Sequence, residues 1–253
     1  MNGIWSSVKG RLRDSPAAVP FQWLKSRISS PRTQNDEAAI IRMLVNRFAP
    51  PKLFVEFGFG GWEFNCAPLV YAWSGMLLDG DAYNVMIARL AFPSRVVAKQ
   101  AWITRETLDP IFDFVAGRPL GILSIDVDGN DYWLLEALIG LKPAIIIAEY
   151  NSTFQDRSIT IPYDPAFDYR KAPHFLYHGA SLAALSKLAV THGYSLIAVG
   201  STGINSFFVR NDLLDPDDRP LDPATAYREL DHDDGLRASD HWEMVKHLPF
   251  VEV

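Results

Sequence analysis

The chain has 253 residues, of which 48% are hydrophobic and 21% are charged, so it carries enough apolar material for one sizeable core. Its formal net charge of -6 supplies no basic field for a phosphate backbone, which argues against nucleic-acid binding. Its single cysteine, Cys66, excludes an internal disulfide and a cysteine-rich zinc site and fits a cytoplasmic compartment.

The two ends of the chain differ in composition from its middle. Residues 1–34 mix Arg and Lys with scattered aromatics and lack the apolar stretch of a secretion signal, so we expect an N-terminal extension, with an amphipathic arm as the alternative. Residues 35–210 are expected to form the main domain, and residues 211–253 an acidic tail packed on that domain or on a partner. No uncharged run approaches about 18 apolar residues, so stable membrane insertion is not expected.

Strands and helices are expected to alternate along the first part of the main domain. A helix over residues 36–48 is predicted because apolar residues recur at helical spacing before Pro50 and Pro51. Continuous apolar runs predict strands over 53–57, 75–79, 94–99, 121–128 and 144–150. Helices are expected between them, over a stretch through 69–72 and over 82–92, 105–115 and 131–140. This alternation predicts a parallel sheet covered by helices on both faces.

The alternation stops after the fifth strand. Residues 151–177 are polar, aromatic and too long for an ordinary connection of about 2 to 6 residues, which predicts a lid or binding loop. A helix over 180–192 then leads to strands over 194–200 and 204–210. Only a short turn separates these two strands, so they are expected to pair antiparallel as a hairpin.

A glycine-rich string, VEFGFGGWEFN, follows the first strand. Gly58, Gly60 and Gly61 would let a nucleotide-type ligand approach the backbone, beside free N–H groups of the next helix. A tight turn without a ligand is the alternative. Position 63 is Glu, so the spacing differs from G-x-G-x-x-G, which disfavours a dinucleotide pyrophosphate. Asp79 ends the second strand, where a carboxylate can accept both hydroxyls of a ribose, and Asp81 is the near alternative.

Polar side chains also follow the fourth and fifth strands. Asp126, Asp128, Glu149 and Asn151 should converge, because the carboxyl ends of neighbouring parallel strands face one crevice. Carboxylates brought together in this way need a cation, and oxygen ligands suit Mg²⁺ or Mn²⁺. In the alternative interpretation Asp128, or Asp131, caps the following helix.

His178 lies between the long loop and the helix over 180–192, so it can face the same crevice. An imidazole there would serve as a general base, since its ordinary pKa of about 6.5 is near working pH. His174 is the competing candidate, and a loop histidine that only hydrogen-bonds is the bland alternative.

The string LSIDVDGNDYWLLEAL, over 123–138, resembles the strand-four motif of FkbM-type methyltransferases. IIAEYN and YHGASLAALSKLA match later parts of that family, and the resemblance covers about residues 53–210 but not the long loop or the ends. It implies an α/β, Rossmann-like class I methyltransferase fold, whose seven-stranded, mostly parallel sheet ends in a C-terminal antiparallel hairpin. The implied cofactor is S-adenosyl-L-methionine.

The resemblance also implies roles for single residues. Glu56 would face the methionine amino group, Asp126 would serve both the cofactor and a metal, and Trp102, Ile103 and Thr104 would lie near adenine, although Trp102 is equally expected in the core. Glu149 and His178 are the catalytic candidates. Metal ligands at the ends of strands four and five are similar to those of some catechol and sugar O-methyltransferases.

The expected reaction is therefore O-methylation of a small-molecule or sugar-containing acceptor, with a divalent metal as an optional assistant. A binding or scaffold protein that keeps the fold without catalysis is the first alternative. An NAD-dependent oxidoreductase is disfavoured by the glycine spacing, the closing hairpin and the lack of a Tyr-x-x-x-Lys pair. The sequence is compatible with a homo-oligomer.

Overall fold

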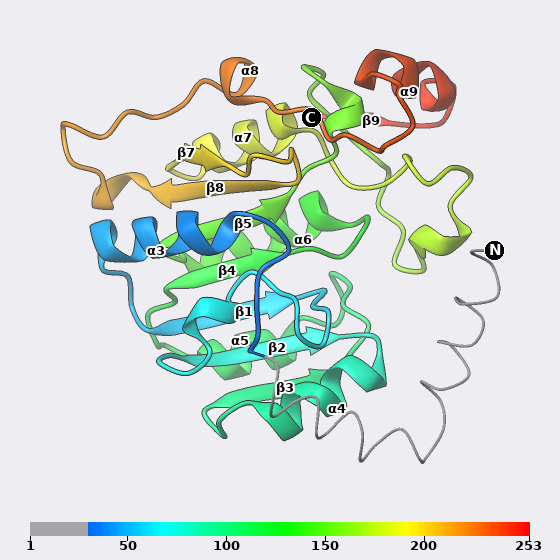
Figure 1. Ribbon diagram of the computed structural model, residues 1–253. Helices are drawn as coiled ribbons and strands as arrows, with labels where there is room; N and C mark the ends of the chain where they lie inside the picture. Colours follow the sequence, from blue (N-terminus) through cyan, green and yellow to red (C-terminus); the bar gives the residue numbers. More distant parts are fainter. Residues whose placement is uncertain (1–29) are drawn as a thin grey trace.

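A seven-stranded sheet forms the centre of the computed structural model, which describes residues 30–253 (Figure 1). The strands are β1 (Leu53–Phe57), β2 (Ser74–Asp79), β3 (Val96–Gln100), β4 (Ile122–Ile125), β5 (Ile145–Glu149), β7 (Tyr194–Val199) and β8 (Asn205–Arg210), in the order β3-β2-β1-β4-β5-β8-β7. The pairs among β1 to β5 are parallel, and β8 is antiparallel to both β5 and β7. The expected fold is confirmed; the predicted N-terminal extension falls, over residues 1–29, outside the described residues.

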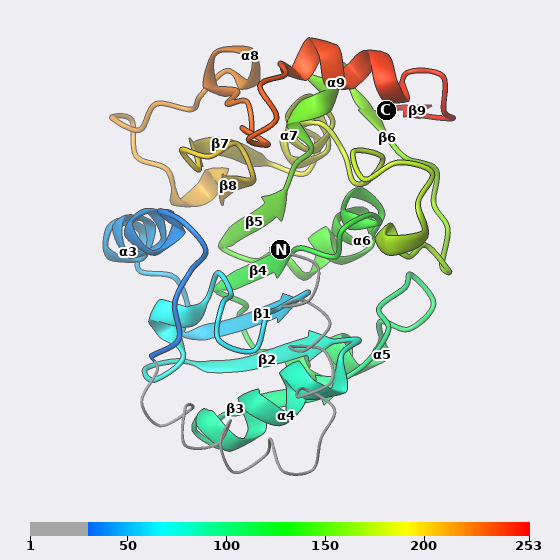
Figure 2. The ribbon, with the colours of Figure 1, turned by 45° about the vertical axis from the view of Figure 1, so that its right-hand side comes forward.

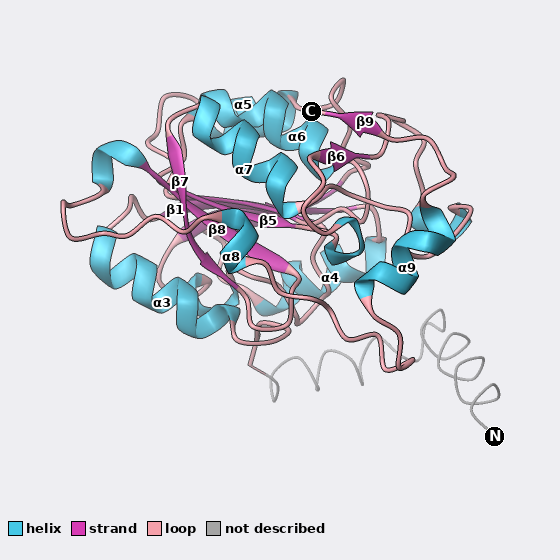
Figure 3. Cartoon of the chain, turned by 90° about the horizontal axis from the view of Figure 1, so that it is seen from above, coloured by secondary structure: helices cyan, strands magenta, loops and turns pink. Residues whose placement is uncertain are grey.

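Helices cover both faces of the sheet. They are α3 (Glu37–Phe48), α4 (Ala82–Ala91), α5 (Asp109–Val115), α6 (Asp131–Leu138) and α7 (Leu182–Thr191). Viewed from above, α5, α6 and α7 lie on one face, and α3 and α4 on the other (Figure 3). Strand residues alternate between the two layers, so Val55 packs with α5 and α6 while Phe54 packs with α3 and α4. None of the helices within residues 30–253 is long and apolar enough to cross a bilayer.

The segment after the glycine-rich string differs from its prediction. The expected helix through 69–72 is only a 3-10 turn, η1 (Ala67–Leu69). Upstream of it, Gly60 and Glu63 exchange backbone hydrogen bonds of 2.9 and 2.8 Å, so these residues form a tight turn instead of a helix. Proline at position 68 cannot donate a backbone hydrogen bond, which further limits this segment to short turns. No α-helix N-terminus therefore directly follows Gly61.

The start of α5 was also predicted too early. The expected helix over 105–115 begins only at Asp109, because Thr104 and Thr107 form a hydrogen-bonded turn before it. Pro110 occupies the first turn of the helix, where its missing N–H is tolerated.

The long loop and the tail form a small second layer together. The loop contains η3 (Ser152–Phe154), β6 (Ile159–Thr160) and η4 (Tyr169–Lys171), and the tail contains η5 (Asn211–Leu213), α8 (Pro223–Ala226), α9 (Ala238–Val245) and β9 (Val251–Glu252). β6 pairs antiparallel with β9, close to α9 (Figure 2), and Trp242 of α9 packs with Phe154 and Phe250 in a separate apolar cluster. The loop is therefore held by residues far from it in the sequence.

Candidate active site

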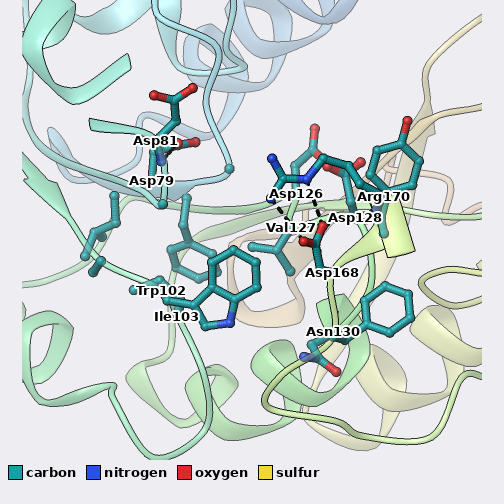
Figure 4. Close-up of a pocket in the computed structure, with 17 residues that line it drawn as sticks. Asp79, Asp81, Trp102, Ile103, Asp126, Val127, Asp128, Asn130, Asp168 and Arg170 are labelled. Atoms are coloured by element: carbon teal, nitrogen blue, oxygen red, sulfur yellow. Dashed lines mark hydrogen bonds and ion pairs between the residues drawn. The ribbon is translucent and has the colours of Figure 1, made fainter. Parts of the chain in front are cut away.

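A pocket of about 390 Å³ opens at the carboxyl ends of β1, β2, β3 and β4 (Figure 4). β1 lies between β2 and β4, so the direction in which the strand order progresses reverses there. Open α/β sheets bind their ligands at such a switch point, because the loops that leave neighbouring strands diverge and leave a crevice. Residues 167–170 of the long loop close the pocket from above the sheet.

Gly58 brings the ends of β1 and β4 together. Its φ of +76° is costly for other residues, and a Cβ there would lie 1.2 Å from the carbonyl oxygen of Asp126. Gly60 and Gly61 do not line the pocket, and the Gly61 N–H donates to Asn84 Oδ1 at 3.1 Å. Of the three predicted glycines, only Gly58 is placed at the pocket.

Asp79 and Asp81 both line the pocket, in different situations. Asp79 Oδ1 accepts the Asp81 N–H at 2.6 Å and Asn84 Nδ2 at 3.4 Å, and burial raises the pKa of Asp79. Asp81 Oδ1 accepts the Tyr83 N–H at 2.8 Å and so caps α4. Asp79 is therefore held at the strand end facing the pocket, whereas Asp81 has a structural task as well.

Trp102 lies in the pocket wall rather than in the core. The residue is 51% exposed, and its Nε1 donates to the carbonyl of Pro165 at 3.0 Å. A Cβ at Gly80 would lie 3.1 Å from the indole, so the ring covers that glycine. With Ile103 it forms an apolar side of the pocket, whereas Thr104 is buried and does not line it.

Glu56 lies beneath the glycine-rich turn and does not line the pocket. Its Oε1 accepts the Asn65 N–H at 2.6 Å, and its Oε2 accepts the Cys66 N–H at 2.7 Å. Burial raises its pKa to about 7, although these hydrogen bonds favour the charged form. The structure shows Glu56 holding the turn in place.

Three carboxylates gather at the ends of β4 and β5. One oxygen each from Asp126, Asp128 and Glu149 lies within 4.8 Å of the others. Burial raises the pKa of Asp126 and of Glu149, and the neighbouring negative charges raise both further. Glu149 Oε2 is buried without a hydrogen-bond partner among the described residues. Figure 4 shows Asp126 and Asp128 apart from the Asp79 and Asp81 pair.

Asp131 shapes the loop that carries two of these acids. Its carboxylate accepts the N–H groups of Val127 at 2.8 Å and Gly129 at 2.9 Å. Between these residues Asp128 adopts a φ of +54°, in the left-handed region. The Asp131 carboxylate therefore binds main-chain N–H groups of the loop before α6, and the N-cap residue of α6, Asn130, forms no side-chain capping hydrogen bond.

The Asn151 amide forms three hydrogen bonds at the two ends of the long loop. Its Oδ1 accepts the Thr153 N–H at 3.0 Å, and its Nδ2 donates to the carbonyls of Leu176 at 2.8 Å and His178 at 2.9 Å. This amide fastens both ends of the long loop to the end of β5.

His178 lies behind Tyr169, which is itself a pocket residue. Their ring centroids are 6.3 Å apart, and His178 does not line the pocket. Burial, assisted by His232, lowers its pKa to about 4, so the imidazole is neutral at pH 7. His174 stacks on Phe175, and its Nδ1 accepts the Leu176 N–H at 3.2 Å, which is a structural arrangement.

The sequence predicted a lid or binding loop over 151–177, but it did not single out Asp168 and Arg170 as the residues of that loop that reach the pocket. Asp168 and Arg170 both line it, and Phe167 packs over Gly129, where a Cβ would come within 2.3 Å of its ring. The run Asp-Tyr-Arg-Lys over 168–171 was a visible concentration of charge. Only the folding of the loop back over the sheet reveals which of these side chains reach the pocket.

No family model matches the chain, and no curated protein matches it either. Among solved structures, the O-methyltransferase from Bacillus cereus in complex with SAH aligns with 82% of this chain and 98% of its own, at 16% identity and a TM-score of 0.47. The N-terminal domain of EvdMO1, in the presence of SAH and D-fucose, aligns with 69% of this chain and 81% of its own, at 17% identity and a TM-score of 0.41. The same domain with SAH bound covers 69% and 79%, at 16% identity and a TM-score of 0.41. At these values the likeness is one of general fold, and the function is inferred from this chain's own residues.

Proposed function

We propose that the chain is a methyltransferase that uses S-adenosyl-L-methionine to methylate a hydroxyl oxygen of a small-molecule or sugar-containing acceptor. The observation that carries this proposal is the charge of the pocket at the switch point. Five aspartates line it, at positions 79, 81, 126, 128 and 168, against a single arginine, Arg170. A cationic sulfonium ligand suits such a pocket, whereas the pyrophosphate of NAD would be repelled by it.

Each part of the cofactor has candidate partners in this pocket. Asp79, at the end of β2, would accept the two ribose hydroxyls, and Trp102 with Ile103 would cover the adenine. Asp126, beside Gly58, would lie at the amino-acid end. Glu56 would act indirectly, by holding the turn next to Gly58. The FkbM-type assignment belongs to this proposal and depends on the motif over 123–138.

When bound, S-adenosylmethionine supplies an electrophilic methyl group on a positively charged sulfur. The acceptor oxygen bonds to the methyl carbon while the carbon–sulfur bond breaks and its electron pair stays on sulfur. The pocket contributes chiefly by holding donor and acceptor in line. Glu149 is the proposed acceptor of the hydroxyl proton. His178 is neutral at pH 7, but it lies behind Tyr169, outside the pocket lining, and its lowered pKa makes it a weak base.

The acidic cluster fits a divalent cation. Asp126, Asp128 and Glu149 offer three hard oxygen ligands, and the unpartnered Glu149 Oε2 is a buried acceptor that a cation would satisfy. Mg²⁺ or Mn²⁺ held there would orient the acceptor hydroxyl and lower its pKa. Asn151 is the fourth proposed ligand, because its Oδ1 accepts only the Thr153 N–H and so keeps one lone pair.

Calorimetric titration of the full chain tests the cofactor. We expect saturable binding of S-adenosylmethionine and S-adenosylhomocysteine, with or without Mg²⁺, and no binding of NAD. Preferential binding of NAD, or no detectable binding of any of the three ligands, would overturn the proposal. Tight binding without methylation of any hydroxyl compound in a screen of sugars and phenols would favour the scaffold alternative.

Metal removal tests the acidic cluster. A chelator-treated preparation is expected to lose methyl transfer and to keep its affinity for S-adenosylhomocysteine, and added Mg²⁺ or Mn²⁺ should restore turnover. Glu149→Gln should behave like the metal-free protein, while the control Glu63→Gln, partly exposed and outside the cluster, should behave like the parent chain. Undiminished turnover in the metal-free preparation would remove the metal from the mechanism.

A further inference from the structure

The amino-acid end of S-adenosylmethionine presents a difficulty for an acidic pocket, because it carries a carboxylate as well as an ammonium group. The ammonium suits the aspartates that line the pocket, but the carboxylate would be repelled by them. Arg170 is the sole cationic side chain among the described residues that line the pocket. We propose that Arg170, from the long loop, binds the α-carboxylate of the cofactor. This inference rests on the proposed function.

Only part of the Arg170 guanidinium forms hydrogen bonds within the described residues. Its Nε donates to Asp168 Oδ1 at 2.8 Å and its Nη2 donates to Asp168 Oδ2 at 3.1 Å. Within residues 30–253 no hydrogen-bond partner is found for Nη1, and the side chain is 73% exposed. The two N–H groups of Nη1 therefore remain for a ligand oxygen.

Asp168 fixes the orientation of the Arg170 guanidinium. Its own side chain is only 11% exposed, and its Oδ1 also accepts the backbone N–H of Arg170 at 3.2 Å. The paired guanidinium holds the pKa of Asp168 well below its usual range, so the carboxylate stays ionised. A cation anchored in this way loses little conformational entropy when it binds a ligand.

The position of Arg170 agrees with the amino-acid end rather than the adenine end of the ligand. Asp168 chiefly raises the pKa of Arg170, and Asp81 and Asp128 raise it further. Figure 4 shows it on the same side of the pocket as Asp126 and Asp128, away from Trp102. The aspartates and the arginine together complement a zwitterion, with acids for its ammonium and a guanidinium for its carboxylate.

A comparison of two ligands isolates the carboxylate. S-adenosylmethionine and its decarboxylated form differ only in that group, and calorimetry measures both affinities in the parent chain, in Arg170→Gln and in Lys171→Gln. The Lys171 variant is a matched control, because Lys171 Nζ lies 3.2 Å from the same Asp168 carboxylate but does not line this pocket. We expect Arg170→Gln to weaken S-adenosylmethionine binding about tenfold or more. Binding of the decarboxylated form should be unchanged or tighter, because this dication gains when a nearby cation is removed.

The outcomes separate this inference from the function on which it rests. Equal weakening of both ligands by Arg170→Gln would mean that Arg170 only holds the loop, and no weakening of either would mean that it takes no part; each result overturns the inference and leaves the cofactor assignment standing. A Lys171→Gln variant with the same ligand selectivity as Arg170→Gln would also overturn it. Failure of the parent chain to bind either ligand would remove the proposed function itself.

Discussion

The pocket floor and its cover are built in different ways. The floor consists of short loops that leave β1, β2, β3 and β4, so the register of parallel strands places Gly58, Asp79 and Asp126. The cover consists of the loop over 151–177, held by a tail that is distant in the sequence. Ser158 Oγ donates to the Val253 carbonyl at 2.6 Å, across a separation of 95 residues. A site placed by strand register tolerates change poorly, whereas a cover held by side-chain packing can loosen by itself.

The largest effect on stability is expected at Gly58, where the floor has no space for a Cβ atom. Gly58→Ala would combine a φ of +76° with main-chain overlap at Asp126, and we expect a loss of about 4 kcal/mol or more in the free energy of unfolding. Gly117→Ala is the matched control, because Gly117 has a φ of +74° but no atom within 4 Å of its Cβ position, so about 1 kcal/mol is expected. Urea denaturation measures both. Equal losses would show that the contact of β1 with β4 is not what requires glycine.

The cover should unfold independently of the floor when a large side chain is removed from its apolar cluster. Phe154 is fully buried and packs on Trp242 and Phe250, so Phe154→Ala should cost about 3 kcal/mol. Hydrogen exchange should then show lost protection in β6, β9 and α9 with β1 and β4 unchanged. Equal loss of protection across all of these strands would mean that floor and cover unfold as one unit.

Within the floor, Asp79 is expected to matter more for ligand affinity than for stability. Asp79→Ala should weaken S-adenosylhomocysteine binding by about 30-fold, near 2 kcal/mol, through loss of charge-assisted hydrogen bonds to the ribose. Asp113→Ala removes the same charge from an exposed position on α5 and should leave the affinity unchanged. Unchanged affinity in Asp79→Ala would transfer the ribose role to Asp81.

The smallest effect is a pH dependence at His178, which directly follows the cover. His178 has a folded-state pKa of about 4, below its ordinary value of 6.5. The unfolded chain therefore takes up a proton first as the pH falls from 6.5 towards 4, and stability is lost over that window. Between pH 7 and pH 5 this group should cost roughly 1.8 kcal/mol. His178→Asn should remove that part of the slope measured by denaturation at each pH, and an identical slope in both proteins would contradict the assignment.

Much of the floor was predictable because it depends on local pattern. Apolar runs predicted every strand of the main sheet to within a few residues, and the short turn over 201–203 predicted the antiparallel pairing of β7 with β8. The positions of Asp79, Asp126 and Asp128 at the pocket followed from the rule that parallel strands end at one edge. The helix expected after Gly61 was wrong, because local turn bonds and the Glu56 carboxylate outweighed the helical pattern.

The side-chain positions in the cover could not be predicted from local sequence pattern. Nothing in the run over 168–171 states that Arg170 lies in the pocket while Lys171 does not, since that depends on how Asp168 orients both cations. The amide bonds of Asn151 and the screening of His178 by Tyr169 depend likewise on long-range packing.

The sequence by itself thus determined the strands of the sheet and the acids at its carboxyl edge, because strand periodicity is a local property. Only the tertiary structure decided which polar side chains hold the backbone in place, as Glu56 does, and which keep hydrogen-bonding groups for a ligand, as Arg170 does. The physical reason is that a polar group's availability depends on the partners that distant segments bring to it.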